Sequence, residues 1–377
     1  MRDQGMLKEL LSAPGPSTVV YIDGPSALPQ VEEEALRDTV IDRVRKTGAP
    51  AADVQAIEEA LPSRDGTPSP SARYLLARNG RIELDLVFPG ARLGQERISF
   101  GRVPLLLPLL RQLGMSVRYL VVETGREGAE VRLERADRHA PERVEEIEGR
   151  ADSLTKVQAG GFSHARYQRS AEEVWKHNQS EVAEVVDRLV EQQRPEFIVL
   201  AGDVRALQLL REGLGKAASE LVTEYEVHTR AEGSEDAGLE RVVAELAERG
   251  RSEEIDALVD RAMADNGSSG AQGVSAVVAA LQPARVDALL LDARLGGAER
   301  TLHALDAEPW IAEGEPEGLD ARTMDELPVA EALARAAILT GARVLIREER
   351  FSTPDEPRSD AEPPEPIAAL RWADDAA

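Results

Sequence analysis

The first part of the chain alternates apolar and polar positions in patterns typical of an α/β fold. Ser17–Asp23 is a β-branched run that predicts a strand, and Val31–Val44 and Ala51–Leu61 carry apolar stripes at helical spacing. Two runs, Arg73–Ala77 and Arg81–Phe88, flank Asn79-Gly80, which is a strong signal for a β-hairpin. Pro104–Leu113 is compact and apolar, and it predicts a buried helix with proline in its first turn.

The middle of the chain predicts a sheet and one long helix. The helix runs from about Ser163 to Gln193, because its apolar positions follow the 3.6-residue period. Asp203, directly after a core strand, is a plausible N-cap for the next helix. The predicted strands are Val117–Glu123, Ala129–Leu133, Val144–Ile147, Phe197–Ala201 and, nearer an edge, Leu221–His228.

The last part alternates helices and strands, which predicts an α-β-α sandwich. Two apolar stripes, one through Leu239 and Leu246 and the other through Ile255 and Val259, precede this alternation. The further elements expected are the helices Val274–Leu281 and Val329–Leu339 and the strands Val286–Leu291, Val344–Arg347 and Ile367–Trp372. We therefore expect an α/β protein of three domains, with ranges 1–113, 114–230 and 231–377.

The composition excludes several kinds of functional site. The 377 residues include no cysteine, which excludes disulfides, thiolate metal sites and cysteine nucleophiles. No apolar run approaches the roughly 20 residues of a membrane span, and the N-terminus lacks a secretory core, so we expect a soluble, cytoplasmic protein. Phosphate-loop, dinucleotide, zinc-protease and nucleophile-elbow motifs are missing, and the five histidines are scattered. We expect neither a metal nor a cofactor.

The formal net charge of -24 argues against nucleic acid as a partner, because an acidic surface repels a phosphate backbone. Three stretches in the C-terminal part supply -18 of it: Thr229–Asp260 carries -6 on a predicted helix face, His303–Leu327 carries -7 in a predicted loop, and the tail after Thr353 carries -5. In contrast, Leu154–Ser170 contains no acidic residue. A solvated loop beside a helix start is one interpretation of that stretch, and a small cationic contact surface is the other.

The acid-free stretch contains the one motif that indicates a chemistry. Residues 160–169 read Gly-Gly-Phe-Ser-His-Ala-Arg-Tyr-Gln-Arg, and the paired glycines allow close approach of another backbone. Ser163 can cap the long helix, and Arg166 and Arg169 share one face of its first turns. A helix N-terminus also favours anions, so the motif suits phosphate. The residues expected to contact RNA are Lys156, Gly160, Gly161, Phe162, Ser163, His164, Arg166, Tyr167 and Arg169.

This motif, followed by a long helix, resembles the central domain of archaeal and eukaryotic class-1 peptide chain release factors. In that family the loop is Gly-Gly-Gln and enters the peptidyl-transferase centre. The hairpin Val117–Leu133 and the strand at Phe197 occur in the same order, and the last part is similar to the C-terminal domain of release factors and Pelota. The resemblance covers about Val117 to Trp372 and extends to a bacterial branch with Balon-like ribosome hibernation factors and relatives of Vms1-type peptidyl-tRNA hydrolases.

The resemblance implies a fold and a set of partners. It implies an RNase H-like central domain and a C-terminal domain similar to ribosomal protein L7Ae, with the ribosomal A site, rRNA and the tRNA acceptor end as binding partners. It further implies that the C-terminal domain contacts a translational GTPase such as EF-Tu, or the ribosomal stalk base. A monomer is the simpler expectation, and no membrane partner is expected.

Two departures from the family pattern affect the expected chemistry. Phe162 stands where release factors have their catalytic Gln, and a phenyl ring cannot orient water by hydrogen bonding. Residues 1–113 also lack an Asn-Ile-Lys-Ser-like codon-reading motif. The leading hypothesis is a non-catalytic A-site factor acting in ribosome hibernation or rescue, since Pelota-type proteins also lack the Gln. Two alternatives are a peptidyl-tRNA hydrolase that positions water with Gln158, His164 or Gln168, and an interaction protein that acts away from the ribosome.

Overall fold

The protein was analysed as a computed structural model, in which the chain forms two compact units. Unit 1 combines Met1–Gly114 with Arg251–Ala377, and unit 2 comprises Met115–Gly250. Each unit is described by itself. The structure describes residues 2–24, 30–62, 70–125, 128–138, 140–149, 163–225, 234–264, 267–297, 299–316, 318, 320–348 and 364–372.

Unit 2 is built on a five-stranded sheet in the order β7-β6-β5-β8-β9. Strands β8 and β9 run parallel to β5, whereas β6 and β7 form antiparallel pairs. The strands are β5 (Arg118–Thr124), β6 (Gly128–Arg135), β7 (Arg143–Glu148), β8 (Phe197–Gly202) and β9 (Val222–Glu224). The helices are α5 (Ser163–Gln193), α6 (Val204–Gly213), α7 (Lys216–Ser219) and the first part of α8 (Ser234–Met263).

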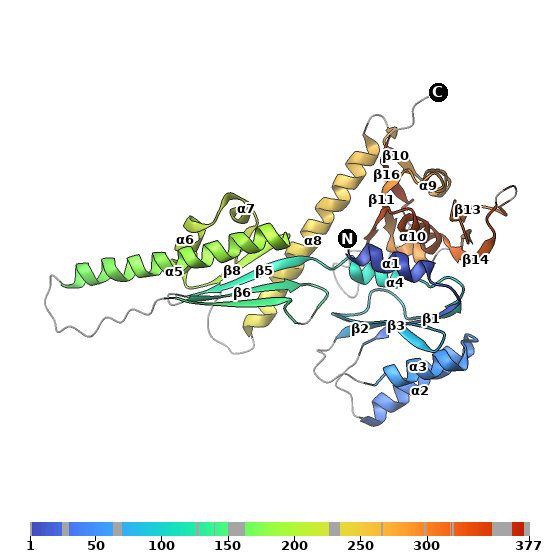
Figure 1. Cartoon of the computed structure of the whole chain (residues 1–377), viewed down its shortest axis with the longest axis horizontal. Coiled ribbons are helices and arrows are strands. Elements are labelled where there is room, and N and C mark those ends of the chain that lie inside the picture. The colour runs from blue at the N-terminus through green and yellow to red at the C-terminus, as the bar shows by residue number, and fades with distance from the viewer. Residues whose placement is uncertain are drawn as a thin grey trace. The chain divides into compact units, whose positions relative to one another are not determined.

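Alternation along β5 sends its side chains to two different helices. Leu120 and Val122 belong to one buried cluster with Val182, Val186 and other α5 residues. Tyr119 and Val121 belong to a second cluster, with Phe197 and the α8 residues Val243, Leu246 and Ala247. Because successive side chains of a strand point to opposite faces, unit 2 is a helix-sheet-helix sandwich (Figure 1).

The first segment of unit 1 folds as an antiparallel sheet with helices around it. The sheet has the order β3-β2-β1-β4. At the β2-β3 hairpin, Asn79 and Gly80 have φ of 54° and 75°, which fits the twist of a two-residue hairpin turn. The elements are α1 (Arg2–Ser12), β1 (Ser17–Asp23), α2 (Gln30–Lys46), α3 (Ala51–Ala60), β2 (Ser71–Arg78), β3 (Arg81–Pro89), β4 (Arg97–Gly101) and α4 (Leu107–Leu113).

The last segment of unit 1 contributes two more sheets, in the orders β10-β16-β11-β15 and β13-β12-β14. Helix α10 (Val329–Leu339) is buried along all 11 of its residues, as expected of a helix that is apolar nearly all round. The other elements are β10 (Gly270–Gln272), α9 (Val274–Leu281), β11 (Val286–Asp292), the 3₁₀ helix η2 (Ala293–Gly297), β12 (Thr301–Leu305), β13 (Ile311–Ala312), β14 (Thr323–Pro328), β15 (Arg343–Arg347) and β16 (Ile367–Leu370).

One hydrophobic core joins the two segments of unit 1. Tyr21 and Tyr74 from the first sheet and Leu109 from α4 lie in the same buried cluster as Leu289 of β11 and Leu333 of α10. Helices α1 and α4 lie between the first sheet and α10 (Figure 1). The first and last segments are therefore one packed body, even though 136 residues of unit 2 separate them in sequence.

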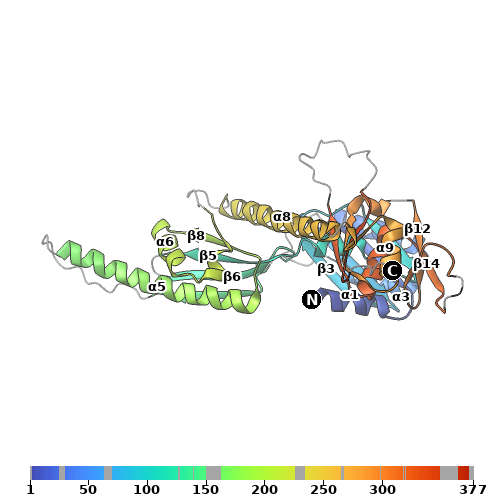
Figure 2. The ribbon, with the colours of Figure 1, turned by 90° about the horizontal axis from the view of Figure 1, so that it is seen from above.

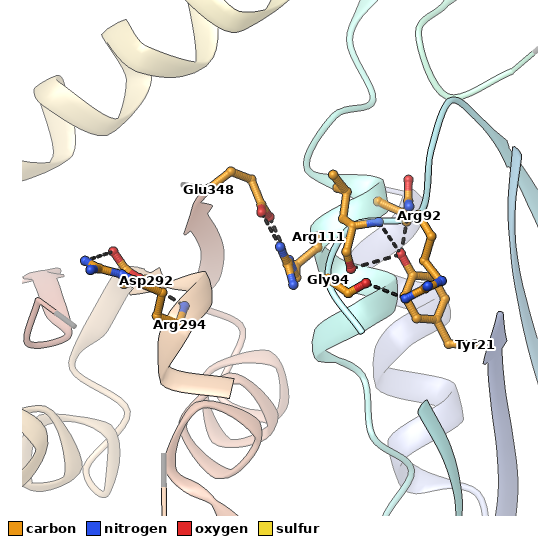
Figure 3. Close-up of polar contacts among 9 residues, drawn as sticks. Tyr21, Arg92, Gly94, Arg111, Asp292, Arg294 and Glu348 are labelled. Atoms are coloured by element: carbon orange, nitrogen blue, oxygen red, sulfur yellow. Dashed lines mark hydrogen bonds and ion pairs between the residues drawn. The ribbon is translucent and has the colours of Figure 1, made fainter. Parts of the chain in front are cut away.

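Polar contacts also join the two segments of unit 1 around α4 (Figure 3). Arg111 of α4 donates from Nε to Glu348, just after β15, over 2.9 Å, and a second guanidinium nitrogen bonds the other carboxylate oxygen. On the side of the first sheet, the Tyr21 hydroxyl accepts from the amide N of Leu93 at 2.9 Å and from Gln112 Nε2 at 2.8 Å. Helix α4 is thus bonded to both segments.

The structure confirms most predicted elements and corrects several. The α/β fold class is confirmed, with α5, α9 and α10 at the predicted bounds. The two stripes at Leu239 and Ile255 belong to the single helix α8, whose two halves face different sheets. The acidic stretch His303–Leu327, predicted as a loop, includes β13 and most of strands β12 and β14. The prediction missed α1, β4 and β10, and it began α4 three residues too early. The three domain ranges stay a prediction.

Candidate functional site

Helix α5 extends beyond the core of unit 2 at its N-terminal end. Between Glu172 and His177 no side chain is buried, and the first buried residues along the described part of α5 are Asn178 and Gln179. The segment 163–177 is 15 residues, or about 22 Å at 1.5 Å per residue. Figures 1 and 2 show this end of α5 reaching past strands β5, β6 and β8. We call residues 163–177 the arm.

Gln179 anchors the arm at the carboxyl end of β5. Its Oε1 accepts a hydrogen bond from the Thr124 hydroxyl at 2.9 Å, and its Nε2 donates to the carbonyl of Gly125 at 2.9 Å. Gln179 and Thr124 are both buried, so each bond satisfies a group that would otherwise be costly to bury. The polar side chain therefore fixes where the exposed helix leaves the sheet.

The neighbouring parallel strand ends on a glycine that the packing requires. Gly202 has a φ of 135°, and a Cβ there would lie 1.9 Å from the carbonyl oxygen of Thr124. Asp203 follows and caps α6, because its carboxylate accepts from the amides of Arg205 at 3.0 Å and Ala206 at 3.2 Å. This confirms the predicted N-cap and places the start of α6 beside the base of the arm.

One ion pair connects α6 to the arm. Arg205 bonds Glu172, and both side chains are largely exposed, at 39% and 52%. An exposed pair of this kind contributes little to stability. It does link the start of α6 to the arm. Val204, at the first position of α6, is 83% exposed and is therefore available to a partner at the base of the arm.

On the sheet face of unit 2 that lies away from α5, charged side chains pair with one another. Arg132 forms ion pairs with Glu123, Glu130 and Glu134. Although burial opposes the charge, the hydrogen bonds that Arg132 donates to these carboxylates raise its pKa above the ordinary value. Burial, and then the charge of Glu134, raise the pKa of the Tyr119 phenol, which stays neutral and donates to Glu134 at 2.8 Å.

The predicted site residues fall into two groups. Lys156, Gln158, Gly160, Gly161 and Phe162 lie outside the described residues. The remaining ones lie on the helical backbone of the first two turns of α5, with Ser163 as the first residue of the helix: Ser163, His164, Arg166, Tyr167, Gln168 and Arg169. The structure thus brings the second group together at the end of the arm, and the roles predicted for these side chains stay predictions.

Comparison with known families matches residues 118–268 to bacterial archaeo-eukaryotic release factor family 2, baeRF family 2. The matched range starts at β5 and includes the Gly-Gly motif, the arm, α6 and all of α8. This segment of the chain is release-factor-like. The resemblance drawn from the loop motif is therefore confirmed, and its start agrees with the matched range to within one residue. The part of the resemblance beyond residue 268 lies outside the release-factor segment.

Two curated relatives extend over nearly the whole chain. They are the uncharacterized proteins MT2704 and Rv2629, from two strains of Mycobacterium tuberculosis. Each is 28% identical to this chain over 364 residues, which cover 92% of this chain and 93% of the relative. The similarity therefore includes both segments of unit 1 as well as the release-factor segment.

Three solved structures resemble the chain at low overall similarity. The archaeal translation termination factor aRF1 is 15% identical, with a TM-score of 0.25 and coverage of 98% of each chain. Archaeal Pelota, solved bound to the ribosome with ABCE1, is 14% identical, with a TM-score of 0.39 and coverage of 99% of this chain and 94% of Pelota. Saccharomyces cerevisiae Dom34 is 10% identical, with a TM-score of 0.40 and coverage of 80% of each chain.

Sequence reasoning missed the residues that position the arm. Thr124, Gln179 and Arg205 were not singled out, although one signal was present: Gln179 is polar at a position that continues the apolar stripe of α5. Within the described ranges, no group of three or more His, Asp or Glu side chains could hold a metal ion. None of the helices described is long and apolar enough to cross a membrane.

Proposed function

We propose that the protein is a ribosome-binding translation factor of the release-factor and Pelota type that occupies the A site in hibernation or rescue. The observation that carries the proposal is the match of residues 118–268, which includes both the Gly-Gly motif and the arm. In this proposal the arm directs residues 160–169 toward the peptidyl-transferase centre. Phe162 at the place of the catalytic Gln makes it a binding factor rather than a release enzyme.

Charge distribution supports a contact with RNA that is confined to the end of the arm. A protein of net charge -24 binds phosphate weakly over its average surface. The acid-free stretch 154–170 adds Lys156, Arg166 and Arg169 to a helix N-terminus, where phosphate is favoured. The arm holds this end about 22 Å from the first buried turn of α5, away from the acids of the sheet. Phe162 or Tyr167 would stack on a base.

The acidic C-terminal stretches suit protein rather than RNA. Under this proposal they face a translational GTPase such as EF-Tu or the ribosomal stalk base, while the arm faces rRNA and the tRNA acceptor end. The proposal includes a cytoplasmic location and a monomeric state, because neither a membrane nor a second copy is needed for the contact.

Ribosome co-sedimentation tests the proposal. The variant Arg166→Glu/Arg169→Glu reverses two charges at the end of the arm and should lose most ribosome binding at moderate salt. The matched control is Lys216→Glu/Arg241→Glu, which makes the same charge change at side chains that are 92% and 75% exposed. The control should bind like the wild type. Equal binding by both variants, or no ribosome binding by the wild type, contradicts the proposal and favours a protein that acts away from the ribosome.

The alternative is peptidyl-tRNA hydrolysis, in which one of the two glutamines or the histidine near the motif would position the water. The test incubates the protein with stalled ribosomes that carry peptidyl-tRNA and measures peptide release. Under the binding proposal, no release above background is expected. Release that disappears in Gln158→Ala, His164→Ala or Gln168→Ala would establish the enzyme and identify the group that positions water.

A further inference from the structure

A buried carboxylate joins the two segments of unit 1. Glu331 lies on α10, and its Oε2 accepts hydrogen bonds from the backbone amides of Leu106 at 2.8 Å and Leu107 at 3.0 Å. Its Oε1 lies 3.1 Å from the same Leu107 amide. These amides stand at the start of α4, where helical N–H groups lack intrahelical partners, and they are separated from Glu331 by more than 220 residues of sequence. Glu331 therefore caps α4 from the other segment.

Leu105, the residue before these two amides, is bonded to the first sheet. The Tyr74 hydroxyl, from β2, donates to the carbonyl of Leu105 at 2.9 Å, and Tyr74 is fully buried. Leu105, Leu106 and Leu107 are thus bonded in succession to the first sheet and to α10. The point where α4 begins is consequently sensitive to the state of the Glu331 carboxyl.

Within the part of the chain that the structure describes, no base contacts this carboxylate directly. Among the residues that the structure describes, no Lys, Arg or His forms an ion pair with Glu331. Arg97 of β4 acts on it through space while donating to the carbonyl of Gly296 at 3.2 Å. Arg335 follows one turn later on α10, yet it donates to the carbonyls of Leu305 at 2.9 Å and Trp310 at 3.0 Å.

Most of the other charged groups described on the elements around α10 are bonded to other partners. On α1, Lys8 and Glu9 are exposed, and the sequence of α9 has no charged residue. The contacts are Arg111 with Glu348, Arg294 with Asp292, Arg343 with Glu254, Arg261 with Asp287, His303 with Thr323, Glu326 with Thr301 and Asp325 with the backbone of Glu326, while Arg347 of β15 is half-buried.

The environment of Glu331 brings the titration of its carboxyl close to neutral pH. Burial raises the pKa of this carboxyl from its ordinary 4.5 to about 7, while the amides of Leu107 and Leu106 and the field of Arg97 hold it from rising further. The same charge acts back on Tyr74, whose pKa burial and Glu331 raise well above its ordinary value. Glu331 therefore titrates in the folded protein where an unfolded glutamate is fully ionised.

We propose that Glu331 is a proton-operated clasp that sets how firmly residues 1–114 are held on residues 251–377. Because the carboxyl binds its proton more tightly in the folded unit than in the open one, proton uptake stabilises the closed state. The stabilisation is fully present below pH 4.5, and it is lost as the pH rises through 7. Mild acidification of the surroundings thus closes unit 1 more firmly, and a rise in pH loosens α4.

Hydrogen exchange of the α4 amides measures the clasp in the full chain. After correction for intrinsic exchange, the opening constant of residues 107–113 in the wild type should rise about tenfold between pH 6 and pH 8, given a folded pKa of about 7 and an open pKa of 4.5. Glu331→Gln cannot ionise, so its opening constant should not change over this range. The matched control, Glu326→Gln, makes the same change at an exposed position of β14 and should retain the tenfold rise.

Two outcomes overturn the proposal. One is an opening constant that rises equally in Glu331→Gln and the wild type, and the other is a wild type whose constant does not rise. If Glu331→Gln fails to fold, Arg97→Met provides the test instead. Removing the field of Arg97 should move the midpoint of the pH dependence upward, and an unchanged midpoint would overturn the clasp.

Discussion

The two units of this protein both bury apolar faces of sheets and helices, but they differ in how the chain connects these elements. Unit 2 is a continuous stretch, Met115–Gly250, in which α5 and α8 cover opposite faces of one sheet. Unit 1 is assembled from Met1–Gly114 and Arg251–Ala377, and α4 and α10 meet inside it although they are remote in sequence. Unit 2 extends one helix beyond its core, whereas unit 1 surrounds one helix completely.

Unit 2 presents the candidate site, whereas the core of unit 1 depends on the first and last segments of the chain packing together. Within unit 2, the arm is anchored by Gln179 of α5, which bonds Thr124 of β5, and by Arg205 of α6, which bonds Glu172. Unit 1 needs both chain segments before its core exists, because apolar side chains from each fill the same cluster. Destabilisation should therefore stay local in unit 2 and spread between the two segments in unit 1.

The largest effect is expected at Arg73 in the first segment of unit 1. Its buried guanidinium binds Asp85 through two hydrogen bonds of 3.0 Å and donates to the carbonyls of Ala60 and Leu61 at the end of α3. Arg73→Met should cost about 4 kcal/mol, because it removes a buried guanidinium and the two hydrogen bonds that it donates to a largely buried carboxylate. The control Arg43→Met removes a partly exposed ion pair and should cost below about 1 kcal/mol. Urea unfolding of both variants checks the difference.

A matched pair of cavity variants tests the comparison directly. Leu109 of α4 and Leu200 of β8 are both fully buried, one in the shared core of unit 1 and one in unit 2. Each change to Ala should cost about 3 kcal/mol. Hydrogen exchange should accelerate at α10 as well as α4 in Leu109→Ala, and only within residues 115–250 in Leu200→Ala. Acceleration confined to residues 1–114 in Leu109→Ala would show that the two segments open independently.

The cap of α6 should have a smaller and local effect. Asp203→Ala removes the acceptor for the amides of Arg205 and Ala206 and should destabilise unit 2 by about 1 kcal/mol. Asp203→Asn keeps an acceptor and should lose only part of this. Thermal unfolding of the two variants compares them, and equal losses would show that the charge rather than the hydrogen bonds stabilises α6.

The smallest expected effect concerns the arm itself. Arg205→Ala removes the ion pair with Glu172 and should change the free energy of unfolding by less than about 1 kcal/mol. Because the pair lies at the base of the arm, amide exchange of residues 172–177 should nevertheless increase. An unchanged exchange rate would mean that the bonds of Gln179 suffice to hold the arm, and Gln179→Ala should then produce the increase instead.

How well the sequence predicted an element depended on how local its cause is. The α5 bounds followed from an amphipathic stripe, the Asn79-Gly80 turn from two residues that accept positive φ, and the α6 cap from one carboxylate beside two amides. Elements whose cause lies in distant contacts were missed. The strands β12 to β14 are short, and six of the eight acids of His303–Leu327 lie in the segments between them, so the sequence shows no clear alternation there. Helix α8 has two separate apolar stripes because its halves face different sheets.

For the candidate site, the residue sequence by itself determined the motif, the acid-free stretch and the release-factor resemblance, because these are properties of neighbouring residues. Only the tertiary structure decided where α5 leaves the sheet, through Thr124 and Gln179, since a buried polar pair is chosen by the fold and not by spacing. The same holds in unit 1. Glu331 looks like an ordinary helical acid in the sequence, and only the packing of α4 against α10 turns it into the buried cap between two remote segments.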